Sequence, residues 1–423
     1  MPRTLDELAA RGVRFTNAFV TTPLCSPSRV SMLTGQHTHH HGVLNNDPPY
    51  GGVTRFNDAS TLATWLQRRG YRTGMYGKYL ADYRRLCRAA AQCYVPPGWD
   101  DWHVFLQQKY YGYQLVENGQ VNSYGTGPAD YSTDVLASKA VEFIMNAHGQ
   151  PFFLHVGFHA PHGDAGGKAK PAPRHLNTLI DIAPWRPTSY DEDDTTDKPP
   201  WLPQIRASDL INPLLPYGVW TDEIRRSQLE ALLAVDEAIE SLMAALDATG
   251  QSDNTVVVFT SDNGYLWGEH RLFFGKDYPY EESLRVPLII RDPRLVGAPR
   301  TETRLALNID LAPTLAELAG VNPTTAVDGM SLVPLLRDPA APWRSDFLFE
   351  WGRLSAPPRA GLPPYVGVRS ERFKYCSYPT VGLAELYDLT IDPNELNDLS
   401  SDPSYARVRA ELQSRLDEYL PAR

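Results

Sequence analysis

Residues 23–35 read Pro-Leu-Cys-Ser-Pro-Ser-Arg-Val-Ser-Met-Leu-Thr-Gly and carry the densest local signal in the chain. Ser26 is a good helix N-cap, Pro27 suits the first helical position, and Gly35 suits the residue after a helix. The pattern therefore predicts a helix that begins directly after Cys25. Free backbone N–H groups and the positive end of the helix dipole favour an anion there. Taken alone, Cys25 is equally well interpreted as a buried structural cysteine.

Helical and strand-like segments alternate around this stretch. Three segments with apolar residues at helical spacing are each followed by a strand-like run. These pairs are 58–70 with 71–77, 133–147 with 152–156, and 222–248 with 255–259. The alternation predicts an α/β fold, with parallel members in the sheet and helices on both faces.

The pattern changes after about Trp343, where short strands replace the alternation. We expect strands at 347–351, 365–370 and 372–377 and a last helix at about 405–420. This predicts a catalytic domain over residues 1–342 and a C-terminal α+β subdomain over 343–423. Between residues 163 and 221 periodicity fades, which indicates either a long loop bordering a substrate cleft or a solvated insertion.

Composition limits the possible partners. The 423 residues include 40 Lys or Arg and 50 Asp or Glu, for a net charge of −10, which disfavours nucleic acid and anionic membranes. No apolar stretch approaches the ~20 residues of a membrane helix, so the chain is expected to be soluble, without a membrane span. Four cysteines are too few for a disulfide framework, although Cys87 and Cys93 could pair in an oxidising compartment.

A family resemblance rests on residue identity and spacing. Cys25-x-Pro-Ser-Arg29, followed by Leu-Thr-Gly35, resembles the signature of type I sulfatases, the formylglycine-dependent members of the alkaline phosphatase superfamily. Further similar segments are 77–80, 159–162, 261–264, Lys276 before 285–287, and 385–389. Segments 77–83, 95–99 and 328–332 are most similar to the glucosamine-6-sulfatase and heparan sulfatase branch.

The resemblance implies a fold and an anion site. The fold would be an alkaline-phosphatase-like sandwich with a largely parallel central sheet flanked by helices, plus a small C-terminal antiparallel sheet with a helix. Cys25 would be oxidised to formylglycine by a formylglycine-generating enzyme and would act as the nucleophile. Arg29, Lys78 and Lys276 would hold sulfate oxygens, and His162 would protonate the leaving alkoxide. Lys78, His162 and Asp262 each follow a predicted strand, at the edge where open α/β sheets bind ligands.

The same resemblance implies a divalent cation. Asp262 and Asn263 are hard oxygen donors, which suit Ca²⁺ or Mg²⁺. With the converted Cys25 they would ligate the cation, calcium in most of the family. The alternative is an ordinary turn after a strand, because Asp-Asn-Gly is a common turn signal.

Other histidines have less specific interpretations. His159 is expected to be a hydrogen-bonded structural residue. The cluster His37, His39, His40 and His41 resembles a metal site in composition, but we expect it to line the cleft or to pack rather than to bind zinc.

Two departures from the family pattern affect the expected site. The family opens with an apolar strand ending in two metal-binding aspartates, upstream of the segment that matches residues 4–19, and this sequence starts after it. A sheet lacking that strand would expose ladder groups and apolar surface. We expect either a truncated start, which would also hide any export signal, or a degenerate relative. Leu80 stands where many sulfatases have a histidine, which leaves Asp262 or another histidine as the base for sulfate release.

The favoured function is hydrolysis of a sulfuric ester on a sulfated sugar, of the type of N-acetylglucosamine-6-sulfate in a glycosaminoglycan. One alternative is a phosphodiester or phosphonate hydrolase of the same superfamily. Another is a catalytically impaired protein that binds a sulfated glycan.

Overall fold

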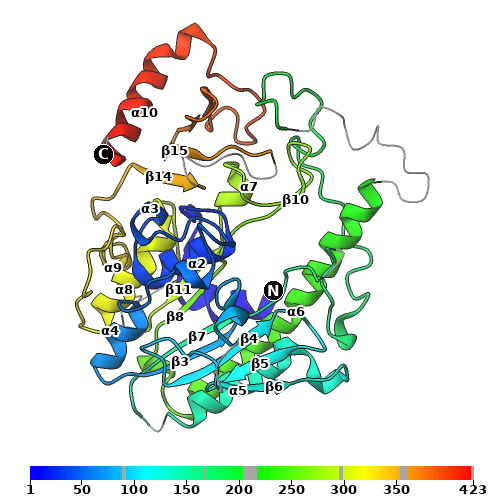
Figure 1. Ribbon diagram of the computed structural model, residues 1–423, viewed down its shortest axis with the longest axis vertical. Helices are drawn as coiled ribbons and strands as arrows, with labels where there is room; N and C mark the ends of the chain where they lie inside the picture. Colours follow the sequence, from blue (N-terminus) through cyan, green and yellow to red (C-terminus); the bar gives the residue numbers. More distant parts are fainter. Residues whose placement is uncertain are drawn as a thin grey trace.

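The computed structural model describes residues 1–87, 92–147, 149–164, 167–202, 217–294, 299–352 and 361–420. Two sheets form its centre (Figure 1), in the strand orders β12-β1-β11-β8 and β6-β5-β4-β3-β7. The first contains β12 (Arg300–Glu302), β1 (Val13–Phe15), β11 (Leu288–Arg291) and β8 (Val257–Thr260). The second contains β6 (Gln120–Ser123), β5 (Gln114–Glu117), β4 (Asp101–Gln107), β3 (Arg72–Gly77) and β7 (Phe152–Gly157).

The pairing within these sheets is mixed. Strand β3 is parallel to both β4 and β7, and β1 is parallel to β12, whereas the other neighbours are antiparallel. Strands β7 and β8 are the end strands of their sheets, and most of their residues are only half-buried. The expected α/β class is confirmed.

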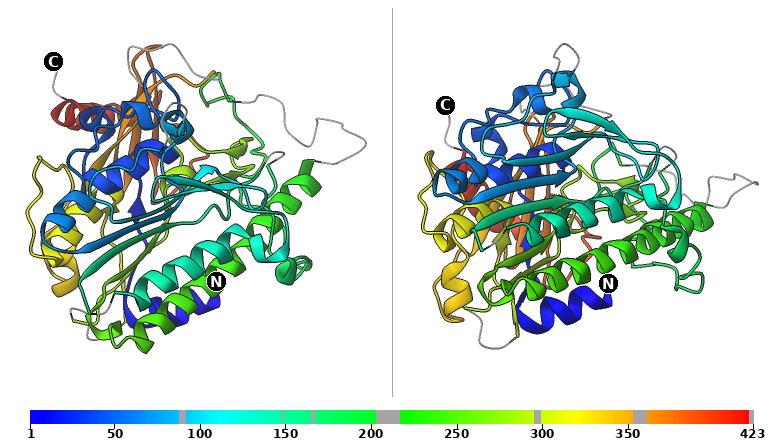
Figure 2. Two further views of the ribbon diagram at one scale, coloured as in Figure 1. Left: turned by 60° about the horizontal axis from the view of Figure 1, so that its bottom comes forward. Right: turned by 90° about the horizontal axis from the view of Figure 1, so that it is seen from below.

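One face of the sheets is covered by α1 (Pro2–Glu7), α5 (Ser132–Met145) and α6 (Tyr217–Ala248), which lie side by side in Figure 2. Asp236 of α6 anchors α1, because its Oδ1 atom accepts hydrogen bonds from the backbone N–H of Thr4 at 2.8 Å and from its hydroxyl at 2.7 Å. Helix α6 begins inside the region where sequence periodicity fades. The described residues from 167 to 202 are turns and loops around one short 3-10 turn, Pro173–His175.

Helices α2 (Cys25–Thr34), α4 (Leu62–Arg68), α8 (Leu311–Leu318) and α9 (Val333–Arg337) form the other group. Apolar side chains of α4, among them Trp65 and Leu66, pack on Ala312 and Ala316 of α8. Helix α2 includes Cys25 as its first residue, with Leu24 as the N-cap, so it begins two residues earlier than the predicted N-cap Ser26 and first helical residue Pro27. Smaller elements are α3 (Thr38–His41), α7 (Glu281–Leu284) and the strand pairs β2 (Ala18–Phe19) with β13 (Ala306–Leu307) and β9 (Leu266–Trp267) with β10 (Phe273–Gly275).

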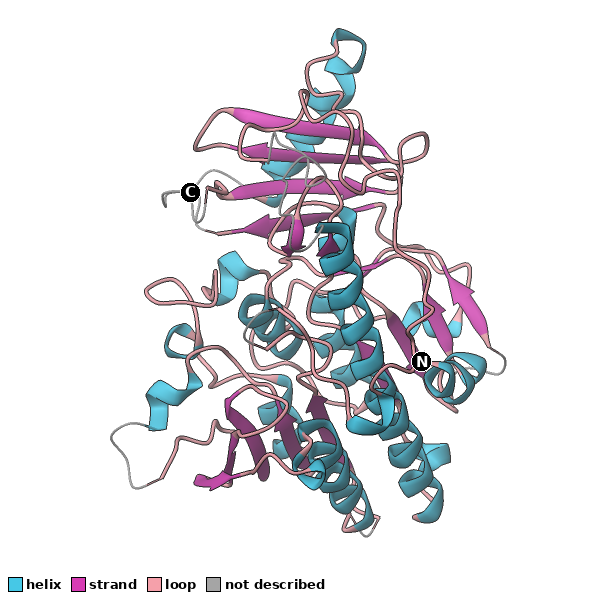
Figure 3. Cartoon of the chain, turned by 90° about the vertical axis from the view of Figure 1, so that its right-hand side faces the viewer, coloured by secondary structure: helices cyan, strands magenta, loops and turns pink. Residues whose placement is uncertain are grey.

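The C-terminal part is a four-stranded antiparallel sheet with a helix beside it (Figure 3). Its strands are β14 (Asp346–Trp351), β15 (Tyr365–Ser370), β16 (Phe373–Tyr378) and β17 (Leu383–Asp388). Leu416 of α10 (Ala406–Tyr419) packs in a cluster with Leu348, Val368 and Leu386. The sequence predicted this sheet and helix, but not β17 as a strand.

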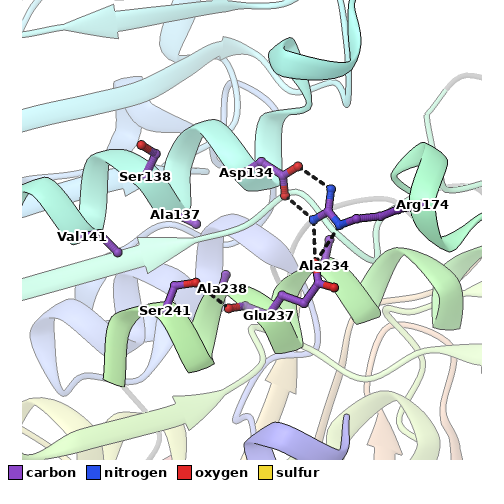
Figure 4. A pocket seen from close by; sticks show the side chains of 9 residues that line it. All are labelled: Asp134, Ala137, Ser138, Val141, Arg174, Ala234, Glu237, Ala238 and Ser241. Atoms are coloured by element: carbon purple, nitrogen blue, oxygen red, sulfur yellow. Dashed lines mark hydrogen bonds and ion pairs between the residues drawn. The ribbon is translucent and has the colours of Figure 1, made fainter. Parts of the chain in front are cut away.

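Cys87 and Cys93 form a disulfide. Among the described residues no helix is both long and apolar enough to cross a bilayer. A surface groove of about 380 Å³ runs between α5 and α6 (Figure 4), where Arg174 forms ion pairs with Asp134 and Glu237. These ion pairs join the loop that carries Arg174 to α5 and α6.

Candidate active site

The carboxyl ends of several strands lie near the start of α2. Lys78 directly follows β3, His159 and His162 follow its parallel neighbour β7, and Asp262 follows β8. The glycine pair Gly77 and Gly157 is required for the close approach of these strand ends. Gly77 has φ +89°, and a Cβ atom on it would lie 2.1 Å from the carbonyl oxygen of Gly157.

Two lysines converge on Cys25. The Cys25 Sγ atom lies 3.2 Å from Lys78 Nζ and 2.8 Å from Lys276 Nζ. Cys25 and Lys78 are buried, with exposed fractions of 7% and 5%, so solvent screens these charges little. Lys276 comes directly after β10, so it approaches from a separate part of the chain.

Asp262 holds the positively charged side chains of Arg29 and Lys78 in place. Its Oδ2 atom accepts from Arg29 Nε at 2.8 Å and from Lys78 Nζ at 3.1 Å. Arg29 also donates to the backbone carbonyl of Lys78 at 2.6 Å. Lys276 Nζ lies 3.4 Å from Asn263 Oδ1. The sequence-predicted residues of the anion site are therefore adjacent to one another.

The charges shift the ionisation of these groups. Burial alone would raise the pKa of the Cys25 thiol, but the ammonium groups of Lys78 and Lys276 reverse the effect and its pKa is lowered. Burial likewise opposes ionisation of Asp262, yet Lys78, Arg29 and Lys276 hold the pKa of its carboxyl far below the usual range. Burial disfavours the charged form of Lys276, but Cys25 and Asp262 raise its pKa to about 12. The site is thus built to stabilise negative charge at position 25.

His162 is next to this cationic group. Burial lowers its pKa to about 4, and the charges of Lys78 and Lys276 act in the same direction. Its Nδ1 atom lies 2.8 Å from the carbonyl oxygen of Gly163, which assigns the proton of the neutral ring to Nδ1. The Nε2 atom is then left as an acceptor. His159 has the structural environment that the sequence predicted, with 3% exposure and a hydrogen bond to Asp164 at 2.9 Å.

The oxygen atoms of Asp262 and Asn263 are the donors available to a divalent cation at this site. Hard oxygen ligands suit Ca²⁺ or Mg²⁺, although Ca²⁺ takes about six to eight of them. Within the described residues, one group of three potential metal ligands has its ligand atoms within 4.8 Å of one another, and it consists of His270, Glu282 and Glu395. Lys374 already forms an ion pair with Glu395, so this second cluster contains its own cation.

Three of the four histidines after α2 contact carboxylates or a hydroxyl group, whereas the buried Nδ1 atom of His37 has no hydrogen-bond partner. His39 Nδ1 lies 2.9 Å from Glu350, and His40 Nδ1 lies 2.8 Å from Asp328. His41 Nε2 lies 3.1 Å from the Ser31 hydroxyl. These contacts join α3 to α2 and to β14. Leu80, which stands where many sulfatases have a histidine, is 2% exposed and packs in an apolar cluster. Its side chain has no titratable group, so it takes no part in proton transfer.

Sequence reasoning missed His155, in the middle of β7. Burial lowers its pKa to about 4, and Arg29 acts in the same direction, which places a neutral imidazole close to the anion site. A polar residue inside an otherwise apolar strand was the available signal. It was overlooked because the strand was interpreted only through its apolar pattern.

Comparison with known proteins agrees with this geometry. A family model described as "Sulfatase" matches residues 1–321, and one described as "N-sulphoglucosamine sulphohydrolase, C-terminal" matches residues 268–421. The human protein named N-acetylglucosamine-6-sulfatase is 30% identical over 437 residues, covering 95% of this chain and 77% of the human protein.

Two further similarities concern a longer relative and a solved structure. The Drosophila melanogaster "Extracellular sulfatase SULF-1 homolog" is 35% identical over 364 residues, which is 83% of this chain. The aligned part is 31% of the Drosophila protein, so the chain spans less than a third of that relative. A structure solved in complex with its substrate D-glucosamine-2-N,6-O-disulfate is 27% identical, with a TM-score of 0.83 over 99% of this chain and 92% of the other.

Proposed function

The chain belongs to the sulfatase family, and on that premise we propose that it hydrolyses the sulfate ester of a sulfated sugar of the N-acetylglucosamine-6-sulfate type. The observation that carries the proposal is Cys25, the first residue of α2, held between the ammonium groups of Lys78 and Lys276. Packing of a thiol does not require two ammonium groups beside it. A sulfuryl group with several negative oxygens requires such positive charge. We infer further that residues 1–342 form the catalytic domain and 343–423 a subdomain that supports it.

The proposed chemistry depends on two groups that the chain would acquire. A formylglycine at position 25, made by a formylglycine-generating enzyme, would supply a hydrated aldehyde oxygen as nucleophile, and a calcium or magnesium ion would supply positive charge beside it. The Sγ atom of Cys25 stands in for the aldehyde oxygen. Asp262 and Asn263 would hold the cation together with that oxygen, and their hard oxygen atoms fit this role.

The remaining steps belong to side chains of the protein. Lys78 and Lys276 bind sulfate oxygens and offset the charge that builds up during transfer of the sulfuryl group. Arg29 orients Asp262, with which it shares a 2.8 Å ion pair. His162 gives a proton to the sugar oxygen as the S–O bond breaks. A bound sulfate ester offsets the two lysine charges that disfavour protonation of His162, so substrate binding itself favours this role.

Relatives support the substrate class. The human relative is named for N-acetylglucosamine 6-sulfate, and the similar solved structure holds glucosamine sulfated at the 2-nitrogen and the 6-oxygen. Names of the longer relatives include the word extracellular, which is consistent with export of this protein.

The test is a matched pair of cysteine variants produced in a host that makes formylglycine. Cys25→Ala abolishes hydrolysis of N-acetylglucosamine 6-sulfate, whereas Cys376→Ala, at the other free cysteine of the described chain, retains it. Peptide mass spectrometry finds the aldehyde at position 25 in the wild-type protein. An unmodified thiol in active protein, or faster hydrolysis of an aryl phosphate than of an aryl sulfate, contradicts the proposal.

A further inference from the structure

The β9–β10 hairpin connects the anion site to a second group of side chains. Leu266 of β9 pairs with Gly275 of β10, the residue before Lys276. Tyr265 precedes β9; burial raises the pKa of its hydroxyl to about 12, and the nearby Lys276 opposes that rise. Its ring lies 6.2 Å from that of Trp267, measured between centroids. The hairpin that ends just before Lys276, a contact of Cys25, therefore also carries Trp267.

Two tryptophans of this group are held by buried partners. Glu269, with 1% exposure, accepts from the indole N–H of Trp185 at 2.6 Å and from the backbone N–H of Trp267 at 2.6 Å. The indole N–H of Trp267 donates to Gln228 of α6 at 2.5 Å. Trp185 nevertheless remains 43% exposed. An exposed aromatic ring whose polar atom is fixed from behind is preorganised for contact with a ligand.

Arg225 of α6 stands between these rings. Its guanidinium carbon lies 5.7 Å from the Trp185 centroid and 5.5 Å from the Trp267 centroid. One Nη atom donates to the carbonyl of Ala183 at 3.0 Å, and the buried Nε atom has no hydrogen-bond partner. Among the residues that the structure describes, no carboxylate oxygen forms an ion pair with Arg225. The guanidinium is thus fixed in place with donors left over.

The neighbouring arginine has a different environment. Arg186 pairs with both oxygens of Asp222 at 2.8 Å and lies over the ring of Tyr190. Asp222 is the acidic residue one helical turn before Arg225, and its carboxylate is occupied by Arg186. This arrangement neutralises Arg186. Asp222 and Glu269 still act electrostatically on Arg225, but among the described residues neither forms an ion pair with it.

We propose that Arg225, with Trp185 and Trp267 beside it, forms a subsite for a second anionic group of the sulfated glycan, distinct from the sulfate that is removed. The inference rests on the proposed function. A guanidinium matches the planar carboxylate and two oxygens of a sulfate in a bidentate contact, and its partial burial strengthens that contact. The tryptophan faces cover apolar parts of the sugar. The second anion is either a sulfate on the same sugar or a uronate carboxylate on the adjoining one.

The test compares substrates that differ in this anion. Steady-state kinetics are measured with an aryl sulfate, N-acetylglucosamine 6-sulfate, glucosamine 2-N,6-O-disulfate and a 6-sulfated disaccharide that carries a uronate. Arg225→Ala lowers kcat/KM about ten- to a hundred-fold, mainly through KM, for whichever of the last two substrates presents the anion. The first two substrates change less than about twofold. The affected substrate identifies the source of the anion.

Arg174→Ala is the matched control, because it removes an arginine charge that is paired with Asp134 and Glu237, leaves the Arg186–Asp222 pair in place, and leaves this discrimination intact. An equal loss of kcat/KM for all substrates after Arg225→Ala would show that Arg225 only holds the tryptophans in place. No loss of kcat/KM for any substrate would likewise contradict the subsite.

If Arg225→Ala fails to fold, the subsite is tested on the wild-type enzyme by measuring inhibition of aryl sulfate hydrolysis. Either glucosamine bearing only the 2-N-sulfate or the disaccharide without its 6-sulfate then inhibits at least tenfold more tightly than glucosamine. Equal inhibition by all three compounds overturns the subsite. Failure of the proposed function is distinct, since the wild-type protein then hydrolyses none of the four sulfates.

Discussion

Lys276 Nζ lies 2.8 Å from the Sγ atom of Cys25, although the two residues are 251 positions apart in the sequence. The contact depends on the β9–β10 hairpin, which ends at Gly275, and on the start of α2. Lys78 lies 3.2 Å from the same sulfur, so the position of the nucleophile is flanked by two ammonium groups. The charge on either lysine should therefore control the chemistry of residue 25.

Removing one ammonium group should make the thiol harder to ionise. In protein from a host that leaves Cys25 unconverted, Lys276→Met raises the pKa of Cys25, because burial favours the neutral thiol and one opposing charge is gone. The midpoint of the alkylation rate against pH then moves upward. The rate of modification by a small alkylating reagent, followed by peptide mass spectrometry, measures it.

Cys376 provides the internal reference for that experiment. It is also buried and free, but burial and Glu385 raise its pKa well above the usual value. In the wild-type protein Cys25 should react at lower pH than Cys376. Lys276→Met should reduce the difference between the alkylation midpoints of the two cysteines. An unchanged midpoint for Cys25 would mean that Lys276 does not act on it electrostatically.

The contribution of His162 to kcat should be larger for substrates whose leaving group must be protonated. Burial and the two lysines lower its pKa to about 4, so in the free enzyme the protonated form grows as the pH falls from 7 toward 4. For a sugar sulfate, kcat/KM should rise over that interval. His162→Ala should cost about 10²–10⁴-fold in kcat with the sugar sulfate, but under tenfold with nitrophenyl sulfate, whose leaving group is stable without a proton. Equal losses on both substrates would argue against a role in proton transfer.

Asp262 should be required for the divalent cation. Asp262→Asn removes the one carboxylate at the proposed metal position and frees Arg29 and Lys78, which contact it at 2.8 and 3.1 Å. The variant should lose about one equivalent of calcium by elemental analysis after dialysis, and at least about a hundredfold in kcat/KM. Asp253→Asn, at an exposed position, should retain both. Calcium content that does not differ between the two variants would place the ion elsewhere.

Local signals predicted much of the fold. The helix–strand pairs before β3, β7 and β8 were readable because apolar spacing changes from helical to continuous at each junction. Capping was predicted less well. The helix expected over 58–70 begins at Leu62, and its cap is Thr61, whose hydroxyl accepts from the backbone N–H of Thr64. Ser26 was the expected cap of α2, but the cap is Leu24, which offers no side-chain acceptor. Tertiary contacts decide between adjacent start positions, and Ser26 instead accepts from the backbone of Ala81 through its hydroxyl.

The site was predictable where motifs are contiguous and unpredictable where only folding joins residues. The sequence around Cys25, Asp262 and Lys276 signalled an anion site through family resemblance. Nothing in the sequence connects Trp185 with Trp267, because their association depends on a buried carboxylate, Glu269, that contacts both. Likewise, Arg225 resembles any surface residue of a long amphipathic helix until Asp222 is seen to be paired with Arg186.

Glu282 should make the folded protein less stable as the pH rises. Burial, with the nearby carboxylates Glu395 and Glu269, raises the pKa of Glu282 to about 8 from a usual value of 4.5. Between these values the folded state retains a proton that the unfolded state has lost, so the free energy of unfolding falls by up to about 1.4 kcal/mol for each pH unit. Glu282→Gln removes this dependence: its thermal midpoint should match the wild type near pH 5 and exceed it near pH 8. Exposed Glu371, changed to Gln, is the control and should leave the pH profile unaltered. A wild-type midpoint that stays above that of Glu282→Gln at pH 8 would mean that the ionised carboxylate stabilises the fold, with Lys374 or a bound cation as its partner.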